Sequence, residues 1–497
     1  MGKGISRRVL LGGLGAILAQ PGLAKAPMRS PVPLRRPADF TARSTPSLQA
    51  LIATAGLGGK FGCVVADARS GRVLETHNPL LQMPPASVSK AVTAAYALDM
   101  LGPDHVFTTR LVATGPVEAG RIQGDLVLVG GGDPMLDTNA LADMAARLKA
   151  AGVIGVTGMF RVHAGALPYQ RQIDPGQPDH LGYNPAIGGL NLNFNRVHFE
   201  WKPVEGKYTV AMDARSDRYR PEVRMAEMRV VDRDMPVYTY EQARDVDKWT
   251  VARTALGNGG SRWLPVRRPD LYAGEVFQVL AAAQGVRLPA PRVSRKTPVK
   301  GWVLAVQNSV PLSTITRLML KHSNNLVAEV LGLTASQARG TQVTSLESSA
   351  RSMSGWMKAE MAAKRPKLKD HSGLSDTSRL SASDMVAALV KTGAGSDLHG
   401  LMKEIPALDQ NGDLIEGEAH QVRAKTGTLN FVSSLAGYVT TKGGRPLAFA
   451  IFTGDLERRA KIARADRERP PGARGWSRRA RRVQHQLITR WAELHDV

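Results

Sequence analysis

The chain has 497 residues, which is enough for about two to four domains with buried cores. Its hydrophobic content of 43% and charged content of 22% are typical of a soluble globular protein, and its single cysteine excludes an intrachain disulfide. The formal net charge of +23 is unusual and indicates attraction to polyanions such as nucleic acid, anionic lipid or an acidic cell-wall polymer.

Residues 1–26 have the pattern of an export signal. Arg7 and Arg8 precede an apolar run over residues 9–19, and small residues follow up to Ala26. Residues 6–11 resemble a bacterial twin-arginine signal; the alternative is an ordinary secretory signal with two chance arginines. The run is shorter than the roughly 20 residues that span a bilayer, and no other stretch is long enough. We therefore predict a periplasmic protein, soluble or peripherally associated with the envelope.

A hairpin and a helix begin the folded part. Residues 62–65 and 73–75 have the composition of two strands, and Cys63 between them is expected to be a buried, inert thiol. Residues 86–101 then carry apolar side chains at a period of 3.6, which predicts a helix.

The first turn of this helix holds a serine and a lysine on one face, Ser87 and Lys90. A serine hydroxyl needs a base within hydrogen-bonding reach, and lysine can serve when burial and a second cation favour the neutral amine. The alternative is a chance pair on an exposed helix; the apolar composition of this helix favours catalysis.

The stretch from about residue 105 to 300 differs from the segments on either side of it in its pattern of predicted elements. This difference predicts an inserted module. Strand and helix patterns alternate there, with strands at 107–112, 126–129, 197–201 and 208–212 and helices at 141–151 and 270–284. We assign residues 106–165 with 265–299 to one insertion domain and residues 166–264 to a second. Residues 38–105 with 300–497 form the catalytic part.

The catalytic part resumes with two amphipathic helices, residues 312–319 and 326–333, around the triplet Ser323-Asn324-Asn325. One interpretation of the triplet is a polar loop that caps the second helix. The other is catalytic, with Ser323 relaying a proton to the leaving group and Asn325 holding a substrate amide. A helix at 383–390, strands at 435–439 and 447–452, and a basic helix at 477–494 that packs on those strands complete the pattern.

The tripeptide Lys-Thr-Gly occurs twice. Gly393 ends the copy at residues 391–393, directly after a predicted helix, and is expected to be a helix C-cap. The copy at Lys425, Thr426 and Gly427 precedes strands, and its glycine allows close approach of substrate to an edge strand. We therefore place the site at the second copy, with the N–H groups of Ser87 and Thr428 forming an oxyanion hole.

Two other patterns, the glycines at 130–132 and the histidines, do not indicate a function. The glycines at 130–132 lack the Gly-Lys-Ser/Thr of a phosphate loop, and the histidines lack metal-ligand spacing. We expect no metal, no cofactor and no nucleic-acid partner.

Taken together, the chain resembles the D-alanyl-D-alanine carboxypeptidase/endopeptidase family of low-molecular-mass class C penicillin-binding proteins, of the penicillin-binding protein 4 type. The motifs that carry the resemblance are the following: Pro85-Ala86-Ser87-Val88-Ser89-Lys90, Gly124-Asp125-Leu126, Gly132-Asp133-Pro134, Ser323-Asn324-Asn325, Ser372-Gly373-Leu374-Ser375 and Ala424-Lys425-Thr426-Gly427-Thr428. The resemblance implies an α+β fold: a serine β-lactamase/DD-peptidase-like catalytic domain with a five-stranded antiparallel sheet between helices, and a large two-part insertion. The separation of 236 positions from Ser87 to Ser323 suits that insertion.

The resemblance also implies residue roles. Ser87 matches the acylated nucleophile and Lys90 its base, while Ser323, Asn325 and Lys425 match groups that relay protons and orient substrate. Thr426, Gly427 and Thr428 match the substrate-binding strand. The middle residue of the second motif, often Asp in the family, is Asn324 here. Residues 190–193 resemble a strand of the insertion that approaches the active site.

The predicted function is a penicillin-sensitive serine DD-peptidase that cleaves D-Ala-D-Ala termini, D-alanyl cross-links of peptidoglycan, or both. Its partners are then peptidoglycan stem peptides and cross-links, with β-lactams as covalent inhibitors. A β-lactamase or esterase on the same fold is one alternative, although no Glu-x-x-x-Asn deacylation motif stands early in the insertion. A catalytically idle wall-binding scaffold is the other, and intact Ser87, Lys90 and Lys425 argue against it.

Overall fold

The computed structural model describes residues 45–294, 300–406, 414 and 420–496, and all elements below lie in the compact unit Pro46–Val497. The predicted export signal lies outside the described residues. Within the described ranges, none of the helices combines the length and apolarity that a membrane span requires.

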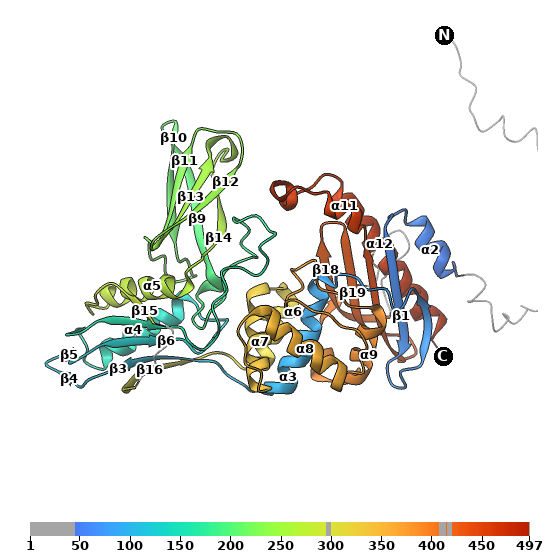
Figure 1. Ribbon diagram of the computed structural model, residues 1–497, viewed down its shortest axis with the longest axis horizontal. Helices are drawn as coiled ribbons and strands as arrows, with labels where there is room; N and C mark the ends of the chain where they lie inside the picture. The colour runs from blue at the N-terminus through green and yellow to red at the C-terminus, as the bar shows by residue number, and fades with distance from the viewer. Residues whose placement is uncertain (1–44, 295–299, 407–413, 415–419, 497) are drawn as a thin grey trace, which may run out of the picture. The chain divides into compact units, whose positions relative to one another are not determined.

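One antiparallel sheet organises the catalytic part (Figure 1). Its strand order is β17 (Lys403–Ile405), β18 (Gln421–Leu429), β19 (Val432–Thr440), β20 (Pro446–Gly454), β1 (Lys60–Asp67), β2 (Val73–His77). The five strands from β18 to β2 form the expected antiparallel sheet, and the short β17 adds a sixth along part of β18.

Helices cover both faces of this sheet because alternate side chains of its central strands are apolar on both sides. On one face, Leu435 and Phe449 pack against α12 (Ala473–Leu494) through Leu487 and Trp491. On the other face, side chains such as Ala450 of the same strands join the larger helical core. The basic C-terminal helix therefore packs on the strands as predicted.

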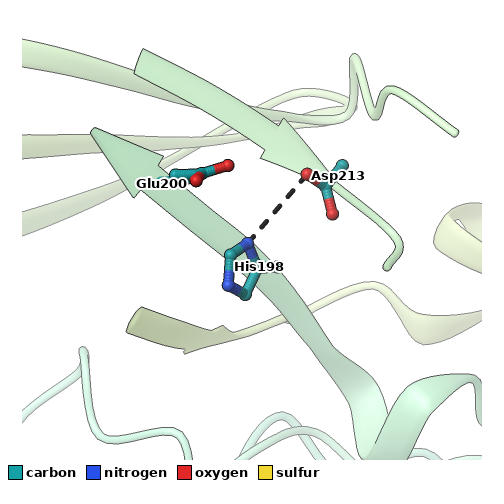
Figure 2. Close-up of side chains that lie close together, drawn as sticks. All are labelled: His198, Glu200 and Asp213. Carbon is teal, nitrogen blue, oxygen red and sulfur yellow. Dashed lines mark ion pairs between the residues drawn. The ribbon is translucent and has the colours of Figure 1, made fainter. Parts of the chain in front are cut away.

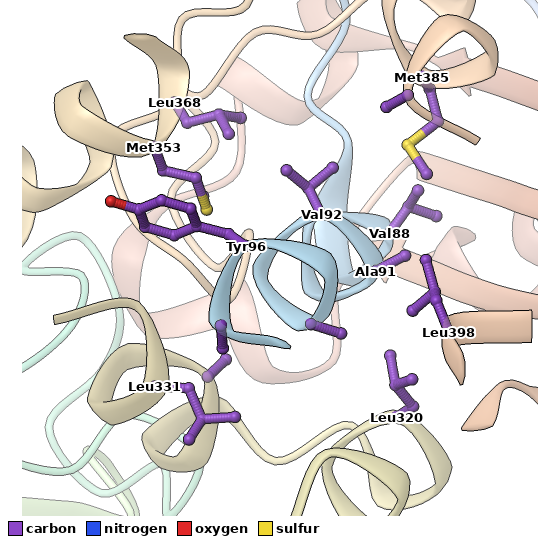
Figure 3. Packing of buried hydrophobic residues seen from close by; sticks show 14 of the residues in the cluster. Val88, Ala91, Val92, Tyr96, Leu320, Leu331, Met353, Leu368, Met385 and Leu398 are labelled. Carbon is purple, nitrogen blue, oxygen red and sulfur yellow. The ribbon is translucent and has the colours of Figure 1, made fainter. Parts of the chain in front are cut away.

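The larger core surrounds α3 (Ser89–Leu101), which follows the 3-10 turn η1 (Ala86–Val88). Figure 3 shows α3 residues Val92 and Tyr96 among side chains from several elements, including Leu331 and Met353. The elements packed around α3 are the following: α6 (Leu312–His322), α7 (Asn325–Ala338), α8 (Leu346–Glu360), α9 (Ala382–Thr392), α10 (Asp397–Leu401). Eight of its thirteen residues are buried, so the helix that carries the candidate base is locked in position.

The predicted insertion forms separate sheets on its own core. Its five-stranded sheet has the order β15 (Arg292–Ser294), β8 (Phe160–His163), β6 (Leu126–Val129), β3 (Thr108–Ala113), β16 (Trp302–Asn308). Two helices accompany it, α4 (Thr138–Ala150) and α5 (Pro269–Ala283), and a small sheet joins β4 (Val117–Glu118), β5 (Arg121–Ile122), β7 (Gly155–Val156).

Two three-stranded sheets follow within the insertion. One contains β10 (Lys207–Asp213), β9 (Arg196–Val204), β14 (Gly260–Pro265), and the other contains β11 (Ala226–Val231), β13 (Val246–Ala252), β12 (Tyr238–Ala243). Short 3-10 turns lie at η2 (Asn193–Asn195) and η3 (Arg253–Ala255).

One predicted boundary was wrong by about ten residues. We began the second catalytic segment at residue 300, but β16 pairs antiparallel with β3 and so belongs to the sheet of the insertion. Strand pairing across nearly 200 positions has no local sequence signal, which explains the error. The division of the chain into three domains otherwise stays a prediction.

Candidate active site

Ser87 lies in the 3-10 turn η1, and Lys90 lies in the first turn of α3 directly below it. The Lys90 side chain is completely buried. Its Nζ atom lies 3.0 Å from Ser87 Oγ, 2.7 Å from Asn325 Oδ1 and 2.7 Å from the Ser372 carbonyl oxygen. The predicted pair is therefore in hydrogen-bonding contact, and two further residues complete the environment of the amine.

These three contacts determine how the Lys90 amine is oriented. The Asn325 and Ser372 oxygens can only accept hydrogen bonds, so they take both N–H groups of a neutral amine. When the amine is neutral, its remaining lone pair faces Ser87 Oγ at 3.0 Å. When it is protonated, the ammonium has three donors for the same three acceptors, so charge develops without rearrangement.

The pKa of Lys90 suits this task. Burial first, and then the nearby Lys425 cation, lower the pKa of Lys90 to about 7, while Asp370 and Glu329 act in the opposite direction. A substantial share of the amine is therefore neutral near pH 7, whereas a lysine with the ordinary pKa of 10.5 is almost fully protonated there. The sequence predicted both causes of this shift.

The second motif joins α6 to α7. Ser323 ends α6 in the left-handed conformation, with φ of 57°, and Asn324 caps α7 by accepting a hydrogen bond from Val327 N. Asn325 donates through its Nδ2 to the Tyr183 carbonyl at 2.9 Å and accepts from Lys90. The capping interpretation is thus correct for Asn324, and it coexists with a contact between the motif and the lysine.

The third motif lies on β18, which passes directly against Ser87. A β-carbon built on Gly427 would lie only 2.8 Å from the Pro85 carbonyl oxygen and 3.0 Å from Ser87 N. Among the described strands, β17 covers β18 only from Val422 to Ala424, so the edge from Lys425 onward lacks a strand partner. Burial, and then Lys403, lower the pKa of Lys425 to about 8.

The other Lys-Thr-Gly copy ends a helix, as predicted. Helix α9 runs to Thr392, and Gly393 caps it with φ of 90°.

A cavity of about 270 Å³ opens above Ser87. Four predicted residues line it, namely Ser87, Ser323, Asn325 and Thr428. Lys90, Lys425, Thr426 and Gly427 are not among its lining residues; Lys90 lies buried beneath it. Sequence reasoning missed several lining residues: Gln177 and Tyr183 from the insertion, and Arg459, Arg467 and Glu468 from the segment after the sheet. No local signal marks them, because only the tertiary fold brings these segments to the cavity.

One expectation for the insertion was wrong in part. Residues 190–193 do not form a strand and do not line the cavity. The segment does approach the site, because η2, which begins at Asn193, contacts α7. Asn193 donates to Thr138 Oγ1 at the start of α4, and its Oδ1 accepts from Thr138 N. Its side chain is used inside the insertion, and the loop containing Tyr183 contacts the second motif in its place.

Among the residues that the structure describes, one group has the composition of a metal site. His198, Glu200 and Asp213 lie on the neighbouring strands β9 and β10, with ligand atoms within 4.8 Å of one another (Figure 2). Arg215 already forms ion pairs with both carboxylates, at 2.8 Å to Glu200 and 2.9 Å to Asp213. We therefore assign the group to an ion-pair cluster.

An antiparallel sheet between helical layers, with a Ser-Lys pair where a buried helix begins, defines a fold of the penicillin-binding/DD-peptidase class. Comparison with known proteins agrees with this class. The D-Ala-D-Ala carboxypeptidase 3 (S13) family matches residues 45–468, and the chain belongs to this family. The protein is a serine-type DD-peptidase, a D-Ala-D-Ala carboxypeptidase that acts on peptidoglycan.

Individual relatives are similar over most of their length. The chain is 28% identical to a D-alanyl-D-alanine carboxypeptidase of Actinomadura sp. (strain R39), covering 82% of this chain and 80% of that one. It is 24% identical to the D-alanyl-D-alanine carboxypeptidase DacB of Haemophilus influenzae, covering 82% and 88%. The crystal structure of penicillin binding protein 4 (dacB) from H. influenzae superposes with a TM-score of 0.72 at 20% identity, covering 90% of this chain and all of that one.

Proposed function

We propose that Ser87 attacks the carbonyl of the penultimate D-alanine of a stem peptide, with Lys90 as its general base. The observation that carries this proposal is that Asn325 and the Ser372 carbonyl accept hydrogen bonds from the Lys90 amine. The lone pair of the neutral amine is then free to accept the Ser87 proton. The Ser87 oxygen forms a bond to the carbonyl carbon, the bond to the terminal D-alanine nitrogen breaks, and the proton passes from Lys90 to that nitrogen. Water then hydrolyses the acyl-enzyme and restores the serine.

The neighbouring residues supply binding and proton relay. We assign Ser323, which lines the cavity, to proton transfer toward the leaving amine. The backbone N–H groups of Ser87 and Thr428 form the oxyanion hole, supported by the close approach of Gly427 to Ser87 N. Lys425 binds the terminal carboxylate with Thr426, and Asn325 orients both Lys90 and the substrate amide.

The same geometry accounts for reaction with β-lactams. A β-lactam amide occupies the position of the D-Ala-D-Ala amide, so Ser87 opens the ring and stays acylated. Support comes from the related penicillin binding protein 4 of H. influenzae, whose structure in complex with a β-lactam superposes with a TM-score of 0.67.

We further propose that the protein acts in the periplasm and is exported by the twin-arginine route. The support is the pair Arg7-Arg8 before an apolar run. Replacing both arginines by lysine in a signal fused to a reporter should abolish export by that route, and unchanged export would assign the signal to the general pathway.

The test of the function is digestion of intact, cross-linked peptidoglycan with mapping of the released muropeptides. Loss of terminal D-alanine shows carboxypeptidase action, and conversion of dimers to monomers shows cleavage of cross-links. The Ser87→Ala variant should do neither. Muropeptides left unchanged by the wild type would refute the proposal.

A further inference from the structure

A buried carboxylate lies behind the catalytic lysine and has no part in the mechanism above. Glu329 is completely buried on α7, four residues after Asn325 and therefore on the same face of that helix. Its Oε2 accepts a hydrogen bond from His371 N at 3.0 Å, and its Oε1 accepts one from Ser372 N at 2.9 Å. The two oxygens thus hold two successive backbone amides.

Those amides belong to the turn at residues 370–375, in which the Ser372 carbonyl accepts a hydrogen bond from Lys90. Glu329 holds Ser372 by its N–H, Ser372 accepts from Lys90 through its carbonyl at 2.7 Å, and Lys90 contacts Ser87 at 3.0 Å. One continuous series of hydrogen bonds therefore connects the buried carboxylate to the nucleophile.

The other side of the turn is held by a second buried carboxylate. Asp370 accepts from Ser375 N at 2.7 Å and from Gly373 N at 3.2 Å. Gly373 has φ of 74°, and a β-carbon there would lie 1.8 Å from the Ala86 carbonyl oxygen. The turn therefore lies directly against the residue before Ser87, and a small displacement of the turn displaces the site.

We propose that Glu329 is a positioning residue for the general base. By holding the His371 and Ser372 amides, it fixes the Ser372 carbonyl, and this carbonyl with Asn325 directs the Lys90 lone pair toward Ser87. This inference rests on the proposed roles of Ser87 and Lys90.

The cost of burial supports this role. A carboxylate inside an apolar core is unfavourable unless its hydrogen bonds are satisfied, and an apolar side chain at this position of α7 would avoid that cost. Burial, and then the neighbouring Asp370, raise the pKa of Glu329. The charged and titratable groups around the base are Lys90 itself, Asp370, Lys425 and Glu329, with the His371 ring packed on α7 at Gly332.

The test is the substitution Glu329→Gln, which keeps the size of the side chain but replaces one acceptor by an NH₂ group that faces a backbone N–H. We expect kcat on a soluble peptide ending in D-Ala-D-Ala to fall about 10- to 100-fold, with KM within about threefold of wild type. The acid limb of kcat/KM should also move to lower pH. The Ser372 acceptor is misplaced, and a weaker hydrogen bond from Lys90 to this carbonyl disfavours the Lys90 ammonium.

Two further variants separate positioning from folding. Glu329→Asp keeps the carboxyl group on a shorter side chain, so its kcat and acid limb should lie between those of Glu329→Gln and wild type. Glu347→Gln removes an exposed carboxylate that pairs with Lys369, next to the same turn, and should leave the profile unchanged. If Glu329→Gln does not fold, as judged by circular dichroism, Glu329→Asp carries the test alone.

Three outcomes overturn the inference: a wild-type profile in the Glu329 variants, an activity loss with the acid limb unmoved, or the same shift in Glu347→Gln. The Lys90→Ala variant is measured in parallel. If Lys90→Ala retains wild-type activity, the proposed function itself fails, whereas an inactive Lys90→Ala beside an unaffected Glu329→Gln refutes only the role of Glu329.

Discussion

The two lysines of the site should give the enzyme a narrow, bell-shaped pH profile. In the proposed mechanism Lys90 acts as a base only when it is neutral, so kcat/KM should rise with pH through its pKa of about 7. Lys425 acts only as a cation, so kcat/KM falls as the pH rises through its pKa of about 8. The maximum should therefore lie between these values.

Substitution of Lys425 tests this assignment. Lys425→Arg keeps the charge at every working pH, so the alkaline limb should disappear while the acid limb stays near pH 7. Lys425→Ala removes the cation that, after burial, contributes most to lowering the Lys90 pKa, so the acid limb should move to higher pH. With the substrate carboxylate also unpaired, we expect kcat/KM at pH 7 to fall about 10²- to 10³-fold, or about 3–4 kcal/mol.

The assay is hydrolysis of a soluble D-Ala-D-Ala peptide from about pH 5 to about pH 9. The matched control is Lys391→Ala, which alters the same tripeptide at the C-terminal end of α9 and should leave the kinetics unchanged. The reasoning is refuted if Lys425→Ala keeps its acid limb near pH 7 with activity within about threefold of wild type, or if Lys391→Ala produces the loss instead.

Three further results are expected. Intact-mass spectrometry with benzylpenicillin should show one adduct, on the peptide that contains Ser87, and an adduct elsewhere would contradict the mechanism. Gly427→Ala should lower kcat about 100-fold, because its methyl meets the backbone beside Ser87. The control Gly355→Ala adds the same methyl in open space on α8. It should leave kcat unchanged and raise the free energy of unfolding by about 0.5–1 kcal/mol. The twelve Lys and Arg residues from Arg458 to Arg490 are expected to bind the anionic wall polymer, so sedimentation of the protein with purified sacculi should weaken as salt rises to about 1 M. If the protein pellets independently of salt, these residues only solvate a helix.

The candidate site was predictable where chemistry depends on residues close in sequence. The three-residue spacing of Ser87 and Lys90 places both on one face of a helical segment, and local periodicity predicted that segment. The Lys391 copy of the tripeptide was assigned to a helix end by its neighbours alone. Cys63 was predicted to be inert, and burial indeed raises its pKa to about 12.

Some expectations depended on contacts that sequence does not encode locally. The strand β16 was assigned to the catalytic part, although it pairs with β3 almost 200 residues earlier. Residues 190–193 were expected to form a strand near the site because of a resemblance, whereas they form no strand and Tyr183 makes the hydrogen bond with Asn325. In both cases the deciding interaction joins distant segments, and periodicity within a segment carries no information about it.

The sequence by itself predicted the helix that carries Ser87 and Lys90 and the strand that carries Lys425, and the resemblance of its motifs to a known family implied the fold class. The helix and the strand follow from local periodicity, capping and turn chemistry, which act within a few residues. Only the tertiary structure decided the surroundings of the Lys90 amine. The lone pair of Lys90 faces Ser87 because Asn325 and Ser372, 235 and 282 residues away in sequence, take its two N–H groups, and burial among packed helices lowers its pKa. Hydrogen-bond direction and dielectric environment are properties of the packed interior, and they exist only once the chain has folded.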